Sequence, residues 1–389
     1  MGGRPNIEIP LLNLHGEINE LWDEINAAIQ RVLRSGHFVL GPEVEAFEQE
    51  VANFLGVQFA IGLNSGTDAL TIGLKSLGIS EGDEVITTAF SFFATAEAII
   101  HAGAIPVFVD IDPETFNIDP ECIEQEITSR TRAIIPVHLY GNPAPINKIS
   151  SLAQKYNLSV LEDAAQAFGA KHEKGSLTHN SKQPSTEPRV GSLSQATAFS
   201  FYPTKTLGAY GDGGLLTTND PETAKKARML RNHGELQNRQ YTHNIVGYNS
   251  RLDELQAAIL RLKLNHVDNW NGLRQNAATC YRNLLENVSG VRSPTHFYGH
   301  IYHQFSIMLP PDAREGVASY LYDHGISTKI YYPKSLPALY GVRKTYTPES
   351  DNASKSVLSI PIWPGISPGS QARIVDTIRS ALECHLPDD

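Results

Sequence analysis

Residues 200–218 read SFYPTKTLGAYGDGGLLTT and place one lysine, Lys205, between an apolar strand-like run and a glycine-rich turn that leads into another strand. A lysine forms a Schiff base when its amine is held near an aldehyde and kept from free hydration. The aromatic residues that precede Lys205 offer such surroundings. Because a solvated turn lysine fits the same pattern, this stretch needs support from the rest of the chain.

Segments on both sides of this stretch alternate between strand and helix patterns. Apolar strands are predicted over residues 83–90, 104–111, 132–140 and 158–164, with helices over 93–102, 120–127 and 146–156 between them. This alternation predicts an α/β domain with a mostly parallel sheet flanked by helices, in which ligands bind at the carboxyl ends of the strands.

The two ends of the chain carry further helical patterns. Helices are predicted over residues 17–33 and 42–54, and a long helix over 251–270 is expected to begin the passage to a second domain. A strand over 302–309 and helices over 314–324 and 367–384 complete that domain. We therefore expect a large cofactor-binding α/β domain over residues 1–250 and a smaller C-terminal α+β domain over residues 251–389.

Composition narrows the possible partners. The chain has 389 residues with 32 basic and 42 acidic side chains, a formal charge of −10, which argues against nucleic-acid binding. The three cysteines, Cys122, Cys280 and Cys384, are far apart and odd in number, so no disulfide framework or metal site is predicted, and a cytoplasmic location is expected. Neither a signal peptide nor a membrane span is expected.

A few other residues could join Lys205 in one site. Asp163 ends a predicted strand, where its carboxylate could meet a protonated ring nitrogen of a cofactor or simply cap the next helix. Gly66 and Thr67 at a predicted helix start, with Ser200, could bind a phosphate, although a Thr in this position is more often only a helix cap. Phe92 follows a strand and could stack on a flat cofactor or pack in the core.

Several motifs in order resemble the DegT/StrS family of nucleotide-sugar aminotransferases, pyridoxal-phosphate enzymes of fold type I. They are GPEVEAFEQEVANFLG, NSGTDAL, GDEVITTAFSFFATAEAI, EDAAQAFGA, SFYPTKTLGAYGDGG and GYNSRLDELQAAIL. The resemblance covers nearly the whole chain, and a series of ordered motifs is more specific than any single pattern.

The resemblance implies a role in binding pyridoxal 5'-phosphate for eight residues. Lys205 forms the Schiff base and moves the proton, Asp163 pairs with the ring nitrogen, Gln166 lies by the ring hydroxyl, Phe92 stacks on the ring, Gly66, Thr67 and Ser200 hold the phosphate, and Asn249 reaches the phosphate from the neighbouring subunit. It also implies a homodimer with shared active sites. No metal site is expected.

The implied reaction moves an amino group from an amino acid, with glutamate the expected donor, to a keto group of a dTDP-, UDP- or GDP-linked sugar in amino-sugar or polysaccharide biosynthesis. One alternative is a sugar dehydratase of the same family, but those relatives have histidine in place of the lysine. Another is a regulatory protein that binds the cofactor without turnover. Such proteins usually carry a DNA-binding module, and neither an appended domain nor a basic patch is expected in this chain.

Three features depart from the family pattern or remain without a role. Residues 330–341 lack the usual PLH after YP, and Met308 stands where arginine is frequent. The polar run over residues 176–188 is expected to be an exposed surface loop, with a flap over the substrate or the dimer partner as the alternative. We assign no chemistry to His233, His300 or His303, since isolated histidines are more often structural.

Overall fold

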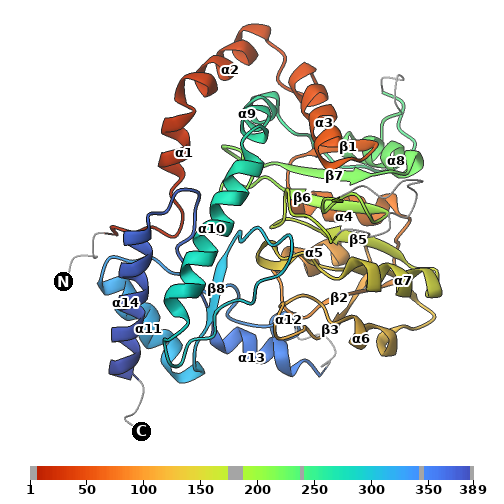
Figure 1. Cartoon of the computed structure of the whole chain (residues 1–389). Helices are drawn as coiled ribbons and strands as arrows, with labels where there is room; N and C mark the ends of the chain where they lie inside the picture. Colours follow the sequence, from red (N-terminus) through yellow and green to blue (C-terminus); the bar gives the residue numbers. More distant parts are fainter. Residues whose placement is uncertain (1–6, 174–186, 237–240, 341–345, 386–389) are drawn as a thin grey trace, which may run out of the picture.

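A computed structural model of the chain describes residues 7–173, 187–236, 241–340 and 346–385. The larger of its two sheets has seven strands in the order β1-β7-β6-β5-β4-β2-β3 (Figure 1). Strand β7 runs antiparallel to both neighbours and the other pairs are parallel, which confirms the predicted mostly parallel sheet. The strands are β1 Phe59–Leu63, β2 Glu84–Thr88, β3 Ile105–Val109, β4 Thr131–Ile135, β5 Ser159–Asp163, β6 Ala196–Ser200 and β7 Gly214–Thr218.

Helices cover both faces of this sheet. They are α3 Pro42–Leu55, α4 Gly66–Ser76, α5 Ala94–His101, α6 Pro120–Ile123, α7 Ile146–Tyr156, α8 Pro221–Arg231 and α9 Glu254–Leu264, with short 3-10 turns η1 Glu124–Glu126 and η2 Leu139–Gly141. Alternate strand residues go to opposite faces. Leu161 and Leu216 pack with α4, α5 and α8, whereas Val160 packs with α7, and Leu215 with α3 and α9. Burial on both faces explains why the strands read as continuous apolar runs.

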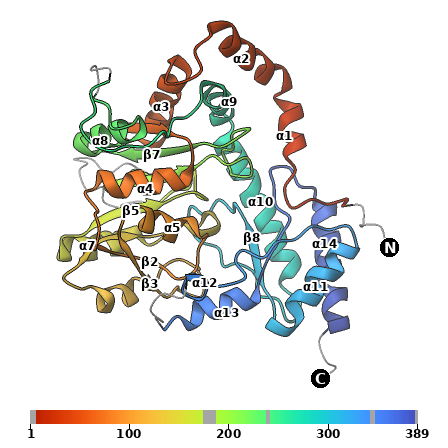
Figure 2. The ribbon, with the colours of Figure 1, turned by 180° about the vertical axis from the view of Figure 1, so that it is seen from behind.

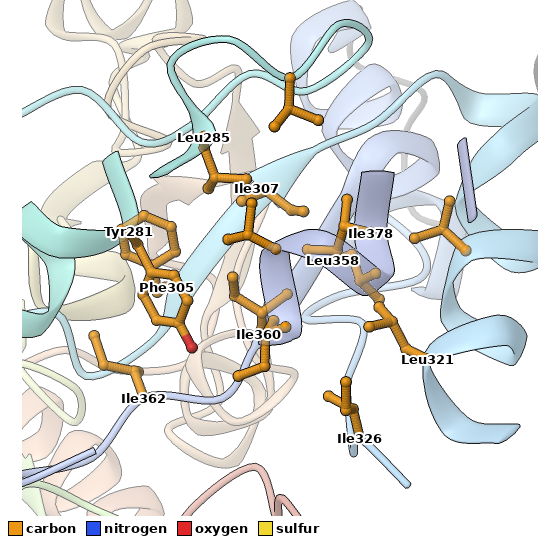
Figure 3. Packing of buried hydrophobic residues seen from close by; sticks show 14 of the residues in the cluster. Tyr281, Leu285, Phe305, Ile307, Leu321, Ile326, Leu358, Ile360, Ile362 and Ile378 are labelled. Atoms are coloured by element: carbon orange, nitrogen blue, oxygen red, sulfur yellow. The ribbon is translucent and has the colours of Figure 1, made fainter. Parts of the chain in front are cut away.

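The C-terminal part forms a second, smaller unit around the two-stranded antiparallel sheet of β8 Phe305–Met308 and β9 Val357–Ile360. Its helices are α10 Val267–Leu285, α11 Pro311–Asp323, α12 Leu336–Tyr340, α13 Pro348–Ser356 and α14 Pro368–His385. Figure 3 shows its core, where Tyr281 and Leu285 of α10 meet Phe305, Leu358 and Ile378. The α+β character agrees with the expectation, and the domain boundary at residue 250 stays a prediction.

Two predicted helices are each divided. The predicted helix over 17–33 is α1 Leu14–Glu20 and α2 Trp22–Ser35, which break at the buried Leu21. Figures 1 and 2 show this pair leading from the N-terminus, beside the C-terminal unit, to α3. The helix predicted over 251–270 breaks between α9 and α10, where His266 stacks on Trp270. An apolar period that continues across a short break hides the break from the sequence.

Helix α3 is capped by a distant carboxylate. Its N-terminal Gly41 has no side chain, and Glu254, the first residue of α9, accepts hydrogen bonds from the amides of Gly41, Glu43 and Val44 at 2.8, 2.9 and 3.0 Å. Glu254 is 1% exposed. An anion at a helix N-terminus satisfies unpaired amides and the helix dipole together. Glu254 therefore joins α3 to α9.

We expect Glu254→Ala to lower the free energy of unfolding by about 3 kcal/mol, because three amides lose a buried charged acceptor. Urea denaturation of the purified protein measures the change. Glu45→Ala, at an exposed position of α3, is the control and should change the free energy of unfolding by less than about 0.5 kcal/mol. Equal losses for the two variants would contradict the capping role.

Candidate active site

The predicted site residues gather at one edge of the large sheet. Asp163 ends β5, Ser200 ends β6, and Lys205 lies in the turn that follows β6. Gly66 begins α4 directly after β1, which runs parallel to β6 because both are antiparallel to β7. The carboxyl ends of these strands therefore meet at the edge where open α/β sheets bind their ligands.

Asp163 is a buried carboxylate, 5% exposed, held from two sides. Its Oδ2 accepts a hydrogen bond from the Thr95 hydroxyl at 2.7 Å and its Oδ1 accepts one from the Ala165 amide at 3.1 Å. Burial raises the pKa of Asp163, while the Thr95 hydrogen bond and the charge of Lys205 act in the opposite direction. The carboxyl group is thus fixed in place near the lysine and suited to a cationic partner.

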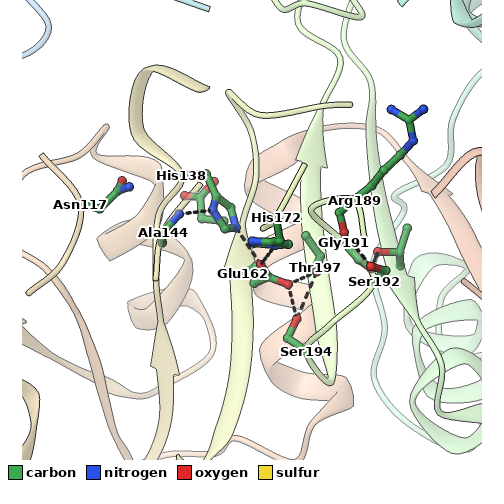
Figure 4. Close-up of polar contacts among 12 residues, drawn as sticks. Asn117, His138, Ala144, Glu162, His172, Arg189, Gly191, Ser192, Ser194 and Thr197 are labelled. Carbon is green, nitrogen blue, oxygen red and sulfur yellow. Dashed lines mark hydrogen bonds and ion pairs between the residues drawn. The ribbon is translucent and has the colours of Figure 1, made fainter. Parts of the chain in front are cut away.

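Glu162, the residue before Asp163, lies on the opposite face of β5 because successive strand side chains alternate. Figure 4 shows it among His138, His172 and Ser194. Glu162 accepts hydrogen bonds from Ser194 Oγ at 2.6 Å and from His138 Nε2 at 2.8 Å. Since the Ala144 amide donates to His138 Nδ1, the ring proton lies on Nε2. Burial opposes ionisation, yet the His138 hydrogen bond, with His172 Nε2 3.8 Å from the same oxygen, holds the pKa of Glu162 well below its usual range. This network fixes the backbone that presents Asp163.

Lys205 is half-buried and its amine is poised for nucleophilic chemistry. Burial lowers the pKa of its amine to about 8, and the Asp163 carboxylate partly offsets this effect. A lysine with a lowered pKa is neutral in a large fraction of molecules near physiological pH, and the neutral amine is the form that attacks a carbonyl.

We expect the rate at which Lys205 forms an imine with pyridoxal to rise with pH around a midpoint of about 8, and to level off at higher pH as the last protonated amine is lost. Absorbance of the cofactor-free protein after mixing with pyridoxal measures the rate. Because Asp163 raises the pKa of Lys205, the rise should move to lower pH in Asp163→Asn. Lys205→Ala is the blank, and a rise centred near pH 10 in the unaltered protein would refute the lowered pKa.

The start of α4 packs tightly against the end of β6. A Cβ on Gly66 would lie 2.7 Å from the Ser200 Cβ, and one on Gly214 would lie 2.2 Å from the Ser65 carbonyl oxygen. These glycines let the backbones of three segments converge. The first amides of a helix have no partner within the helix, so those of Gly66 and Thr67, beside the Ser200 hydroxyl, can receive a phosphate.

Gln166 and Phe92 lie on the side of the site that faces the C-terminal unit. Gln166 Oε1 accepts from the Tyr140 amide at 2.7 Å and its Nε2 donates to the Tyr332 hydroxyl at 3.1 Å. The Phe92 side chain is 56% exposed, and its ring centroid lies 5.9 Å from that of Tyr332. An exposed aromatic face next to Tyr332, which hydrogen-bonds to Gln166, suits stacking, and the core alternative for Phe92 is wrong.

Asn249 lies on the surface and forms a bridge with Asn232. The next residue, Ser250, donates from its hydroxyl to Asn64 Oδ1 at 3.0 Å, which ties this segment to the residue before Ser65. The described single chain thus leaves Asn249 exposed, and its expected reach into a neighbouring subunit belongs to the proposal below.

Three residues without a predicted role also lie in this region. Thr95 donates a hydrogen bond to Asp163, and the Tyr332 hydroxyl accepts one from Gln166. His303 is buried and close enough to Lys205 for the lysine charge to shift its pKa. Burial, Lys205 and Arg274 together lower the pKa of His303 well below its ordinary value, so the ring is neutral. The YYP of residues 331–333 was visible in the sequence, but nothing local indicated that it lies beside Gln166.

These residues fit pyridoxal phosphate. A buried carboxylate bonded to a hydroxyl and an amide suits a protonated ring nitrogen, and the glycine-lined start of α4 suits a phosphate.

Among the residues that the structure describes, no group of three or more histidine, cysteine or acidic side chains could hold a metal ion. Within the same ranges, every helix is too short or too polar to cross a bilayer. The predicted loop over residues 176–188 lies mostly outside the described residues.

Comparisons with known proteins agree with this geometry. The DegT/DnrJ/EryC1/StrS aminotransferase family model matches residues 19–379. A "Pleiotropic regulatory protein" of Geobacillus stearothermophilus is 44% identical over 96% of this chain and 98% of its own length. A "UDP-N-acetyl-3-dehydro-alpha-D-glucosamine 3-aminotranferase" of Acidithiobacillus ferrooxidans is 42% identical over 97% and 99% of the two chains.

A solved structure has the same fold over the whole chain. The crystal structure of DesV from S. venezuelae superposes with a TM-score of 0.89 at 39% identity and covers 100% of both chains. The agreement includes both units of the molecule, which confirms the expected fold type I. The chain belongs to the DegT/DnrJ/EryC1/StrS aminotransferase family.

Proposed function

We propose that the protein is a pyridoxal-phosphate-dependent aminotransferase that moves an amino group from glutamate to a keto group of a nucleotide-linked sugar. One observation carries the proposal: Lys205, in the turn after β6, and the buried carboxylate of Asp163, at the end of β5, lie at the sheet edge where Gly66 begins α4. The similarity to a UDP-sugar aminotransferase over nearly the whole chain supports the substrate class. Genes for amino-sugar or polysaccharide biosynthesis are the expected context.

The proposed binding mode uses the groups at the sheet edge. Lys205 Nζ holds the cofactor covalently and Asp163 faces its ring nitrogen, while Phe92 covers one ring face. Gln166, oriented by Tyr140 and Tyr332, lies by the ring hydroxyl. The phosphate is received by three residues, Gly66, Thr67 and Ser200.

The bound cofactor supplies a positively charged ring that stabilises negative charge at the carbon bearing the amino group. Asp163 keeps that ring protonated. Once the donor's amino group has displaced it from the cofactor, Lys205 Nζ, with its pKa lowered to about 8, would act as the general base that accepts the α-proton of the donor and gives it back later in the transfer. With the ketosugar bound, the same nitrogen moves a proton in the reverse direction, so one lysine serves both halves of the reaction.

The proposed assembly is a homodimer in the cytoplasm. Exposed apolar side chains support a partner surface: Val246, near Asn249, is 95% exposed, and Trp22, Leu33 and Phe38 are exposed along and beyond α2. Exposed apolar groups of this size are typical of interaction surfaces. A second subunit on this surface brings Asn249 to the phosphate of its neighbour. The free thiols of the three cysteines fit a reducing compartment.

Mixed dimers test the shared site. Refolding Lys205→Ala with Asn249→Ala subunits should yield heterodimers with one doubly altered site and one unaltered site. Activity should therefore rise above that of either parent, towards about a quarter of the unaltered enzyme for random pairing, a statistical consequence of closed two-fold assembly. Mixtures that stay at the parental level would show that Asn249 serves its own chain.

The substrate is tested with a panel of nucleotide ketosugars offered together with glutamate, and the aminated product is scored by mass. The regulatory alternative has support from the Geobacillus relative's name, and it predicts cofactor binding with no aminated product from any member of the panel. The dehydratase alternative requires histidine at the lysine position, and the chain has Lys205.

A further inference from the structure

The turn that carries Lys205 is a closed loop. The Ala209 amide donates to the Phe201 carbonyl at 2.7 Å, and the Lys205 amide donates to the Tyr202 carbonyl at 2.8 Å. The two limbs touch, because a Cβ on Gly208 would lie 2.4 Å from the Pro203 carbonyl oxygen. A loop that is closed on itself still needs contacts from outside to fix it on the protein.

Helix α9 supplies two such contacts from one face. Gln256 Oε1 accepts a hydrogen bond from the Tyr210 amide at 2.8 Å, and Lys263 Nζ donates to the Gly208 carbonyl. Residues 256 and 263 lie two helical turns apart, so both side chains leave α9 in the same direction. The loop is thereby fastened at its end, three residues beyond Lys205.

Lys263 is an unusual choice for an anchor, since its side chain is only 1% exposed. Its ammonium pairs with Glu17 Oε1 of α1 at 2.6 Å and lies 5.0 Å from the centre of the Tyr210 ring. Burial lowers the pKa of Lys263, and Glu17 opposes that shift. A buried ion pair of this kind contributes little net stability compared with apolar packing, so stability alone does not account for it.

We propose that Lys263 is a positioning residue for Lys205: its ammonium, held by Glu17, fixes the Gly208 carbonyl and so the loop that presents the Lys205 amine. A charged donor gives the carbonyl a stronger and more directional hydrogen bond than a neutral one. The link to catalysis rests on the proposed role of Lys205. The claim that Lys263 fixes the loop does not depend on that role, so the effect on the loop and the effect on catalysis can be tested separately.

The first test is hydrogen exchange of cofactor-free protein, followed in a peptide that spans residues 201–213. In Lys263→Met the Lys205 and Ala209 amides should exchange at least about tenfold faster, as a locally loosened loop requires. Arg261→Met is the matched control, because it removes ion pairs to Glu43 and Glu50 from the same helix without touching the loop. Unchanged exchange in Lys263→Met, or equal acceleration in Arg261→Met, would overturn the proposal.

The second test uses the loaded enzyme. Lys263→Met should lower kcat for glutamate at least about tenfold with little change in KM, and should shift the pH midpoint of the bound cofactor's absorbance, whereas Lys263→Arg should recover most of both. Normal kcat and midpoint in Lys263→Met would refute the link to Lys205. If Lys263→Met does not fold, Glu17→Gln takes its place and should show faster hydrogen exchange of the loop. Unchanged exchange in Glu17→Gln would then overturn the proposal. Loss of cofactor binding in Lys205→Ala tests the underlying function independently.

Discussion

Lys205→Ala is expected to abolish turnover, with kcat reduced on the order of 10⁴-fold or more, as is usual when the covalent group of an enzyme is removed. The lysine has two tasks in the proposed mechanism, holding the cofactor and moving the proton, and its charge acts on the Asp163 carboxylate. Both tasks are therefore lost together. The variant should retain its stability, because a half-buried lysine is replaced by a small apolar residue.

Borohydride reduction provides the direct measurement. The unaltered holoenzyme should be yellow and should yield one reduced adduct on the peptide that contains Lys205, and Lys205→Ala should yield none. Lys225→Ala, which alters an exposed lysine of α8, is the control and should keep the adduct and full activity. An adduct that persists in Lys205→Ala would sink the assignment of the lysine.

The parts of the site that could be predicted are those with local signals. Asp163 and Ser200 end apolar strands, and Gly66 begins a helix, so their place at the carboxyl edge follows from the sheet that the strand pattern predicts. The close packing of Gly214 on Ser65 gives a physical reason for one glycine of the glycine-rich turn that follows Lys205.

The parts that could not be predicted depend on contacts between distant segments. Thr95 reaches Asp163 from α5, and Tyr332 reaches Gln166 from the C-terminal unit. Each side chain is ordinary in its local sequence, and only the packing of the two units brings it to the site. The same holds for Glu254, which caps α3 from the start of α9.

Asp163→Asn is expected to lower kcat on the order of 10³-fold, in the range found when a preorganised electrostatic contact is lost from an active site. The asparagine oxygen can still accept from the Ala165 amide, and its amide nitrogen can donate to the Thr95 hydroxyl, so the shape of the site is retained while the negative charge is lost. Without that charge the cofactor ring nitrogen is no longer held protonated, and the ring withdraws electrons less effectively. Steady-state kinetics with glutamate measures the effect.

Stability should move in the opposite direction from activity. Burial raises the pKa of Asp163, which means that its ionised form destabilises the cofactor-free folded protein at neutral pH, so a neutral asparagine should maintain or increase Tm. Thr95→Val is the companion variant: it keeps the charge but removes one hydrogen bond, and should lower kcat only about tenfold. If Asp163→Asn had a lower Tm and an unchanged kcat, the carboxylate would be a structural group. Another group would then have to keep the ring nitrogen protonated. If the carboxylate of Asp163 is retained for catalysis, Asp163→Asn should be folded, inactive and at least as stable as the unaltered protein.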